Sequence, residues 1–217
     1  MRTSFFCRTV ALGLLLGGAQ IANANLVKNG SFENPASSGT SELAPTSTYL
    51  TDWTVFNDSL AHISTGNGFT ASHLDYSLDL TGHSARGVGN YGGVKQVIST
   101  VVGATYSISF DVGAWNGGTS KVEVTAGDLT AIGSATTDDL VWTSFSSVFT
   151  AQDTTTTIKL LGLQASYEGH FIGLDNVNVT LRSTPNDVPE PASLPLFGAG
   201  LLALVGLHRR RQGGLKA

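Results

Sequence analysis

The sequence predicts an all-β fold, an antiparallel β-sandwich of the jelly-roll type, for the central part of this 217-residue chain. The clearest strand covers residues 105–112, where apolar and polar side chains alternate at every step. Similar short runs recur along the chain, separated by clusters of Gly, Asn, Asp, Ser and Thr that are typical of turns. No stretch of this part keeps a helical period. Eight or so short strands with turn-rich spacers favour a sandwich.

The other predicted strands are residues 53–56, 77–80, 94–101, 121–125, 143–149, 154–163 and 171–181. In the last of these, the apolar positions change from even to odd numbers after Leu174. A β-bulge at Asp175 and Asn176 would produce this switch, because it inserts one extra residue into a strand.

The first 24 residues have the features of a secretory signal peptide. A basic region with two arginines precedes an apolar stretch (residues 10–19), and Ala22 and Ala24 form an A-x-A cleavage site before Asn25. Cleavage there would remove Cys7, the only cysteine of the chain. We therefore expect the exported part to have no disulfide.

The last thirty residues consist of three consecutive parts. They are a short motif (Val188, Pro189, Glu190, Pro191), an apolar segment (residues 192–207) and a basic tail (208–217) with Arg209, Arg210 and Arg211. As a helix the apolar segment would rise about 24 Å, close to the roughly 30 Å of a bilayer core. Arginines directly after such a segment stay in the cytoplasm, which places the bulk of the chain outside. The alternative, a buried helix of a soluble domain, would show a polar face that this segment lacks.

This tail resembles the PEP-CTERM sorting signal of Gram-negative bacteria. The resemblance implies recognition by an exosortase, a membrane-embedded cysteine protease or transpeptidase, in cells that make exopolysaccharide. Pro189 and Pro191 would hold the motif extended outside the bilayer, as a protease substrate requires. We therefore expect export across the inner membrane and transient anchoring there by a single transmembrane helix. The processed protein would then reach the cell surface or be secreted.

The exported part, residues 25–187, is acidic and long enough for one domain. It contains six of the 12 Lys and Arg residues and 15 of the 16 Asp and Glu residues, which gives a net charge of −9. Phosphate binding needs a basic patch, so this charge disfavours nucleic acid as a partner. Neutral polysaccharide and cations are compatible with it.

The exported part also resembles galactose-binding-like jelly rolls, through its opening segment (25–33) and its closing strand (171–179). Residues 77–82, 93–96 and 103–110 extend the similarity to bacterial choice-of-anchor domains, plant cell-wall proteins of unknown function and carbohydrate-binding modules. The resemblance implies one structural calcium ion, with Glu33 and Asp175 as ligands helped by Asn29. Calcium needs six to eight oxygens, which two acids alone do not supply. Alternatively, Glu33 caps a turn and Asp175 binds the local backbone.

Exposed aromatic side chains are the other candidate binding residues, because sugar rings stack on the faces of Trp and Tyr. Tyr91 and Trp115 lie in glycine-rich loops, the latter beside Asn116, and we expect these three residues to contact glycan. Trp53 and Trp142 precede alternating strands and are expected to serve packing.

The sequence contains no convincing catalytic constellation, so we expect a non-catalytic protein that binds or organises extracellular polysaccharide. Two alternatives stay open. A glycan-acting hydrolase would need two facing carboxylates about 5 to 10 Å apart in a groove. A purely structural matrix or adhesion component would bind no saccharide.

Overall fold

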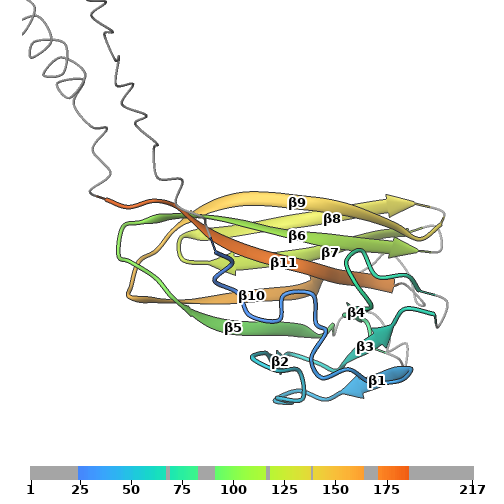
Figure 1. The fold of residues 1–217 in the computed structure, drawn as a ribbon. Coiled ribbons are helices and arrows are strands. Elements are labelled where there is room, and N and C mark those ends of the chain that lie inside the picture. Colours follow the sequence, from blue (N-terminus) through green and yellow to red (C-terminus); the bar gives the residue numbers. More distant parts are fainter. Residues whose placement is uncertain are drawn as a thin grey trace, which may run out of the picture.

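The computed structural model describes residues 24–66, 69–82, 91–115, 118–137, 139–163 and 171–185. Within these ranges the chain forms strands, turns and loops (Figure 1). The strands are β1 (Thr40–Leu43), β2 (Thr54–Phe56), β3 (Leu60–Ser64), β4 (Tyr76–Asp79), β5 (Gly93–Ser99), β6 (Thr105–Trp115), β7 (Gly118–Ala126), β8 (Leu129–Thr137), β9 (Val141–Thr150), β10 (Thr155–Leu163) and β11 (Phe171–Ser183).

The strands form two antiparallel sheets that pack face to face. Sheet A has the order β1-β3-β4-β11-β6-β9, and sheet B has the order β2-β5-β10-β7-β8. From β4 onward, the chain therefore gives the orders β4-β11-β6-β9 and β5-β10-β7-β8, which is the eight-stranded jelly roll. The predicted all-β antiparallel sandwich is confirmed.

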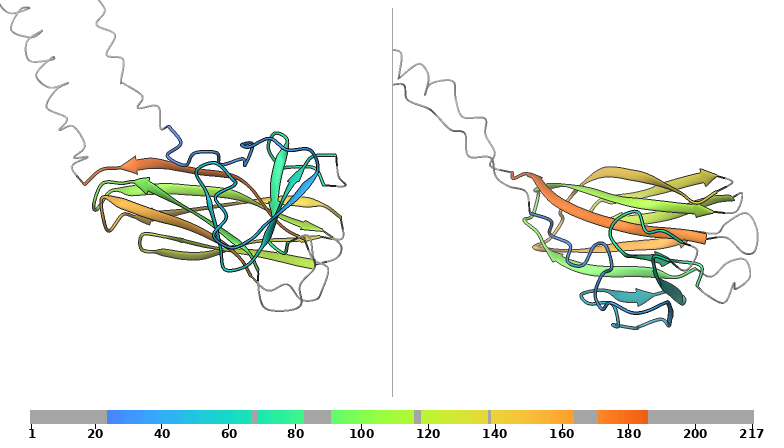
Figure 2. Two further views of the ribbon diagram at one scale, coloured as in Figure 1. Left: turned by 90° about the horizontal axis from the view of Figure 1, so that it is seen from below. Right: turned by 45° about the vertical axis from the view of Figure 1, so that its right-hand side comes forward.

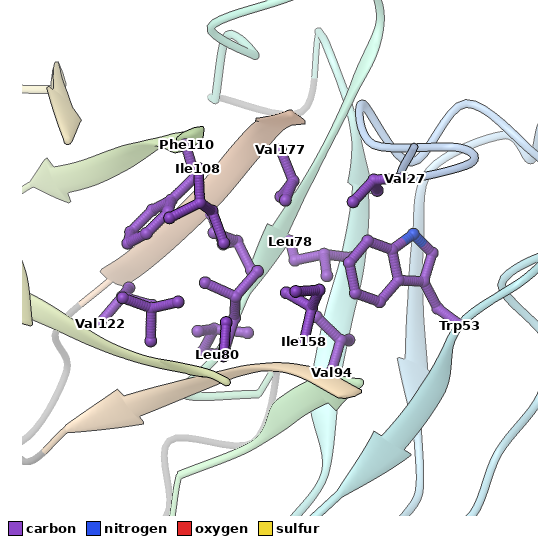
Figure 3. Close-up of a cluster of buried hydrophobic side chains, with 14 of the residues drawn as sticks. Val27, Trp53, Leu78, Leu80, Val94, Ile108, Phe110, Val122, Ile158 and Val177 are labelled. Atoms are coloured by element: carbon purple, nitrogen blue, oxygen red, sulfur yellow. The ribbon is translucent and has the colours of Figure 1, made fainter. Parts of the chain in front are cut away.

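The core lies between the two sheets, and alternate side chains of the longer strands point into it, as in β5, β6, β7 and β10 (Figure 3). In β6, for example, Ile108 and Phe110 are buried in the core, and Ser107 and Ser109 face the outside of sheet A. Trp53, which the sequence assigned to packing, is 2% exposed and closes one side of this core. Burial of these apolar faces is what holds the sheets together.

The predicted bulge in β11 is confirmed. Asp175 lies opposite Asp111 of β6, but the next paired residue of β11, Asn178, lies opposite Ser109. Two residues of β11 therefore face one of β6, and Asn176 takes a positive φ of 52°. As a result Val177 points into the core, although Asp175, two positions earlier, points outward.

The opening segment, residues 25–33, runs beside this bulge. The Leu26 amide donates to the Val179 carbonyl (2.7 Å), and the Val177 amide donates to the Gly30 carbonyl (2.8 Å). A Cβ on Gly30 would lie 2.0 Å from the Val177 oxygen, so only glycine allows this close approach.

The sandwich has two unlike ends. We call the end with the β5–β6 turn (100–104), the β7–β8 turn (127–128), the β9–β10 loop (151–154) and residues 183–185 the tail end, because the chain continues from it toward residue 186. In Figures 1 and 2 the opening segment starts near the same end. We call the opposite end, with Trp115, Val141 and Phe171, the distal end. β6 connects the two over 11 residues, a span of about 33 Å.

None of the described segments forms an apolar helix of membrane-spanning length. The predicted signal peptide up to residue 23, the sorting motif, the apolar segment 192–207 and the arginine cluster lie outside those ranges.

Candidate functional site

A loop between β3 and β4 crosses the outer face of sheet A near the distal end, and we call its residues 69–75 the strap. Figure 1 shows it passing over β11. The Thr70 carbonyl accepts a hydrogen bond from Trp142 Nε1 (2.9 Å), and the His73 amide donates to Asp175 Oδ2 (2.8 Å). The strap is therefore fixed to the sheet through both side-chain and backbone atoms.

Phe69, the first residue of the strap, meets three aromatic side chains of sheet A, and we call the four the aromatic cluster (Phe69, Trp115, Trp142 and Phe171). Phe69 stacks on Phe171 with ring centroids 4.7 Å apart. It also meets Trp115 edge-on at 5.4 Å, and Trp142 meets Phe171 edge-on at 5.9 Å. Such offset and edge-on contacts are the favourable geometries for aromatic pairs, so the cluster stabilises the position of Phe69 on the sheet.

Two glycines form the floor of the aromatic cluster. Gly113 of β6 and Gly173 of β11 lie opposite each other, and Gly113 also lies opposite Trp142. A Cβ on Gly173 would lie 2.5 Å from Phe171 Cε1 and 2.7 Å from Trp142 Cη2. Glycine at these positions is therefore what lets the two rings lie directly on the sheet.

Trp115 is the member of the cluster that solvent reaches most, with 39% of its surface exposed. Among the described aromatic side chains, only Tyr49, at 42%, is also classed as exposed. Trp115 thus has the accessible ring that the sequence analysis required of a glycan-stacking residue. Its predicted neighbour Asn116 lies outside the described residues.

The assignment of Tyr91 to an exposed binding surface is corrected by the structure. Its side chain is only 6% exposed and belongs to the main core. Tyr91 stands two residues before β5, where the chain enters the sandwich, and this position turns its ring inward. A buried ring has no face to offer to a sugar.

Two carboxylates, Asp111 and Asp175, lie side by side under the strap. They are direct partners on β6 and β11, and Ser72 Oγ lies 2.8 Å from Asp111 Oδ2 and 3.0 Å from Asp175 Oδ2. Ser144 Oγ donates to Asp111 Oδ1 at 2.6 Å, and the Asn176 side-chain amide donates to Asp111 Oδ2 at 3.1 Å. One serine hydroxyl has a single proton, so it donates fully to only one of two ionised partners.

Burial raises the pKa of Asp175 from its ordinary value of 3.8 to about 7. Hydrogen bonds from the His73 and Asn176 amides and from Ser72 oppose the rise. Burial likewise raises the pKa of Asp79, on β4, to about 6, against hydrogen bonds from Thr81. When Asp175 is protonated near neutral pH, its carboxyl group can donate a hydrogen bond to the Ser72 oxygen. The Ser72 hydroxyl is then free to donate its own hydrogen bond to Asp111.

The predicted calcium ligands do not form an open oxygen cluster. Glu33 Oε1 accepts the amides of Asp75 (3.1 Å) and Tyr76 (3.0 Å), and both oxygens of Asp175 accept hydrogen bonds. The Asn29 side chain is bonded to the backbone of Asn34 and to the Thr51 carbonyl. No group of three or more His, Cys, Asp or Glu side chains in the described part of the chain is placed to hold a metal. A calcium ion bound here would have to displace these donors.

The Asp111–Asp175 pair also bears on the hydrolase alternative. The two carboxylates share one hydroxyl partner, so they are close enough for paired-carboxylate chemistry. However, Asp175 is 0% exposed and Asp111 is 8% exposed. With the strap in place, a glycosidic oxygen has no path to Asp175, and we assign the pair to holding the strap.

A hollow with a volume of about 340 Å³ lies beside β5, away from the aromatic cluster. It is lined by Leu26, Lys28, Asp52, Gln96, Val97, Ile98 and Ser99. The Gln96 amide is already bonded to the Lys28 backbone through both its oxygen (2.8 Å) and its nitrogen (2.9 Å). This pairing leaves Gln96 with a structural role, so we place the candidate site at the distal end instead.

Sequence reasoning did not identify Phe69, Phe171 or Ser72 as parts of the site. One signal could have found the first two. Gly113 and Gly173 both occupy outward-facing positions inside long strands, and a glycine there marks a close approach by another group. Ser72 carries no such signal, because its partners come from strands far away in sequence.

The raised pKa of Asp175 predicts that stability falls as pH rises. Between about pH 4 and pH 7 the folded state keeps a proton that the unfolded chain releases. The unfolding free energy therefore falls progressively across this range, by up to about 4 kcal/mol in total, and changes no further above it. We expect Asp175→Asn to flatten this dependence in denaturant titrations across the range. Asp153→Asn, at an exposed aspartate of the tail end, should retain the wild-type slope; equal slopes in all three proteins would contradict the prediction.

Calcium binding by Glu33, Asp175 and Asn29 stays a prediction of the sequence alone. If it is correct, the melting temperature of the protein should fall when EDTA is added and recover with excess calcium, because bound calcium stabilises the folded state. Differential scanning calorimetry measures this directly. An unchanged melting temperature in EDTA would show that the calcium prediction is wrong.

Comparisons with known proteins match both the predicted sandwich domain and the predicted sorting tail. Residues 187–211 match the model described as "PEP-CTERM protein-sorting motif", so the resemblance of the tail is confirmed, and the motif indicates export. Halomucin of Haloquadratum walsbyi is 27% identical over an alignment 218 residues long that includes 90% of this chain. The chain spans about 2% of the length of halomucin.

Similar solved structures include two carbohydrate-binding modules. TmCBM61, solved in complex with beta-1,4-galactotriose, is 13% identical, with 74% of this chain and all of that chain covered and a TM-score of 0.49. The CBM22-1 xylan-binding domain of Paenibacillus barcinonensis Xyn10C is 14% identical, with 75% and 97% covered and a TM-score of 0.43. Residues 25–179, which contain the opening segment, both sheets and the aromatic cluster, match a single family model, and the chain belongs to the family described as "Protein of unknown function (DUF642)".

Proposed function

We propose that this chain is an exported surface protein whose jelly roll binds extracellular polysaccharide at its distal end, without catalysis. The observation that carries the proposal is Trp115. Its ring is exposed and held by Phe69 at the rim of an aromatic cluster. A ring that is fixed before binding loses little conformational freedom when a sugar stacks on it.

The charge of the exported part fits a neutral glycan. Its net charge of −9 disfavours acidic polymers, while stacking against the apolar face of a sugar requires no ion pairing. The strap also brings the Thr70 backbone next to Trp142, beside the cluster. Aromatic stacking flanked by polar backbone groups is the chemistry that a saccharide surface requires.

The C-terminal tail accounts for how the protein would reach the cell surface. The tail end of the sandwich lies about 33 Å along β6 from Trp115, and in the sequence the sorting motif (residues 187–211) follows the last described residue there. We infer that the apolar segment anchors the chain in the inner membrane of a Gram-negative cell. An exosortase-type protease would then recognise Pro189, Glu190 and Pro191. During anchoring, the binding end would face away from the bilayer.

A purely structural matrix or adhesion role is the second candidate, since a rigid sandwich needs no ligand to serve as a spacer. It predicts no saccharide binding. The hydrolase alternative receives no support from the described residues, because the close carboxylate pair is covered.

Replacing Trp115 tests the binding role. A glycan array with the wild-type protein would first identify a ligand, and Trp115→Ala should weaken binding of that ligand about tenfold or more, the effect of losing roughly 1.4 kcal/mol of stacking. Isothermal titration calorimetry measures the change.

Tyr49→Ala is the matched control, because Tyr49 is equally exposed but lies outside the aromatic cluster. It should bind as wild type, and both variants should melt close to the wild-type temperature. Wild-type protein that binds nothing on the array would favour the structural role, and equal binding by both variants would move the site away from Trp115.

Mass spectrometry of the mature protein tests the sorting role. If a protease acts at the motif, the C-terminus of protein isolated from the producing cell should lie near Pro189 to Pro191. An intact Ala217 would instead make the tail a permanent anchor. Deleting the exosortase-type enzyme should restore the uncut mass.

A further inference from the structure

Two consecutive valines are exposed at the tip of the β5–β6 turn. Val101 is 52% exposed and Val102 is 53% exposed. Turn tips on a protein surface are usually polar, so two adjacent branched apolar side chains at such a tip call for a partner.

The turn is held rigidly around these valines. The Val101 amide donates to the Tyr106 hydroxyl (2.8 Å), and the Ala104 amide donates to the Val101 carbonyl (3.0 Å). The Gly103 amide donates to the Ala151 carbonyl of the neighbouring loop (2.8 Å). Both side chains are therefore presented by an ordered backbone, so their exposure is a built feature of the fold.

This tip lies where the chain leaves the sandwich. A Cβ on Gly103 would lie 3.3 Å from the Pro185 ring, and Pro185 is the last described residue. Six residues separate Pro185 from Ala192, the first residue of the apolar segment. Fully extended, this stretch spans at most about 25 Å. The valine tip therefore stays within about this distance of the apolar segment and of the structure in which that segment is embedded.

We propose that, before the tail is cut, the valine tip docks on the membrane surface, with Val101 and Val102 in the boundary between headgroups and acyl chains. This inference depends on the membrane anchor of the proposed function. Two valines would bind a bilayer weakly by themselves, but the tether keeps their effective concentration at the surface high.

The charges at the tail end favour apolar docking over attraction to anionic lipid. Asp128 and Asp153 lie in the neighbouring turns, and their carboxylates accept the amides of Thr150 (2.7 Å) and Thr154 (2.6 Å). Arg182 adds one positive charge near the end of β11, so two acids and one base give this end no net attraction to anionic headgroups, and the contact must come from the valines. We therefore expect docking on zwitterionic lipid that changes little with salt.

Docking would fix the orientation of the domain. With the tip on the bilayer, the sorting motif stays close to the surface, where a membrane-embedded protease can reach it. The aromatic cluster at the distal end would point away from the membrane. The valine tip would thus act as a positioning surface for the unprocessed protein.

Site-specific fluorescence tests this docking in the signal-free chain, residues 25–217. This chain has no cysteine, so single cysteines can be introduced at chosen positions and labelled with an environment-sensitive dye. The tip variant is Val102→Cys. Val141→Cys is the matched control, a valine 37% exposed at the distal end. Leu204→Cys reports on the anchor. Each protein is reconstituted in phosphatidylcholine vesicles, with and without a spin label on the lipid acyl chains.

The proposal predicts that dye at position 102 shifts to shorter wavelength, is quenched by the spin-labelled lipid and is shielded from aqueous iodide. Dye at position 141 should show none of these effects. If dye at 204 is quenched but dye at 102 remains as open to iodide as dye at 141, the docking is wrong and the anchor stands. If dye at position 204 is not quenched, both the membrane anchor and the docking of the valine tip are wrong. Shielding at 102 without lipid that grows with protein concentration would assign the tip to a second copy and overturn the proposal.

Discussion

The site depends on one irregularity in the sheet, the bulge at Asp175 and Asn176 of β11. Without it, the alternation that places Leu174 in the core would send Val177 outward and leave the opening segment without its apolar partner. The bulge lets one strand keep Leu174 and Val177 inside while Asp175 faces the strap. The same backbone turn brings the Val177 amide to Gly30, so the opening segment and the strap are both positioned by one local distortion.

The strap reaches its position at an energetic cost. It covers Asp111 and Asp175, which are then held away from water with a single serine hydroxyl between them. Burying two carboxylates is unfavourable unless donors or protons compensate, and the donors from Ser144, Asn176 and His73 do so in part. Aromatic contacts also favour this position of the strap, because Phe69 gains a stacked neighbour in Phe171 and an edge-on one in Trp115.

The sequence predicted the sandwich and the bulge because both depend on alternation along single strands. β8 was not predicted, because its Ala, Gly, Thr and Ser residues show little alternation between apolar and polar side chains. Its position in the sheet is set by pairing with β7. Trp115 is the last residue of β6 rather than part of the predicted loop, but it is exposed, as the glycine-rich sequence after it indicates. Tyr91 has the same kind of glycine-rich surroundings but is buried, so composition did not separate the two. Residues that meet only through the strap, such as Ser72 and Asp111, depend on long-range pairing that no local pattern contains.

The two ends of the sandwich divide the physical tasks of an exported protein. The tail end has ordered turns with apolar side chains at a tip and the exit of the chain, which suits contact with a surface. The distal end has aromatic rings fixed on a glycine floor, which suits a flat ligand. Because β6 and β11 run without interruption between the ends, apart from the bulge, orientation at one end sets orientation at the other. A rigid jelly roll is suited to this task, since its continuous hydrogen-bond ladders transmit direction over the length of a strand without a hinge.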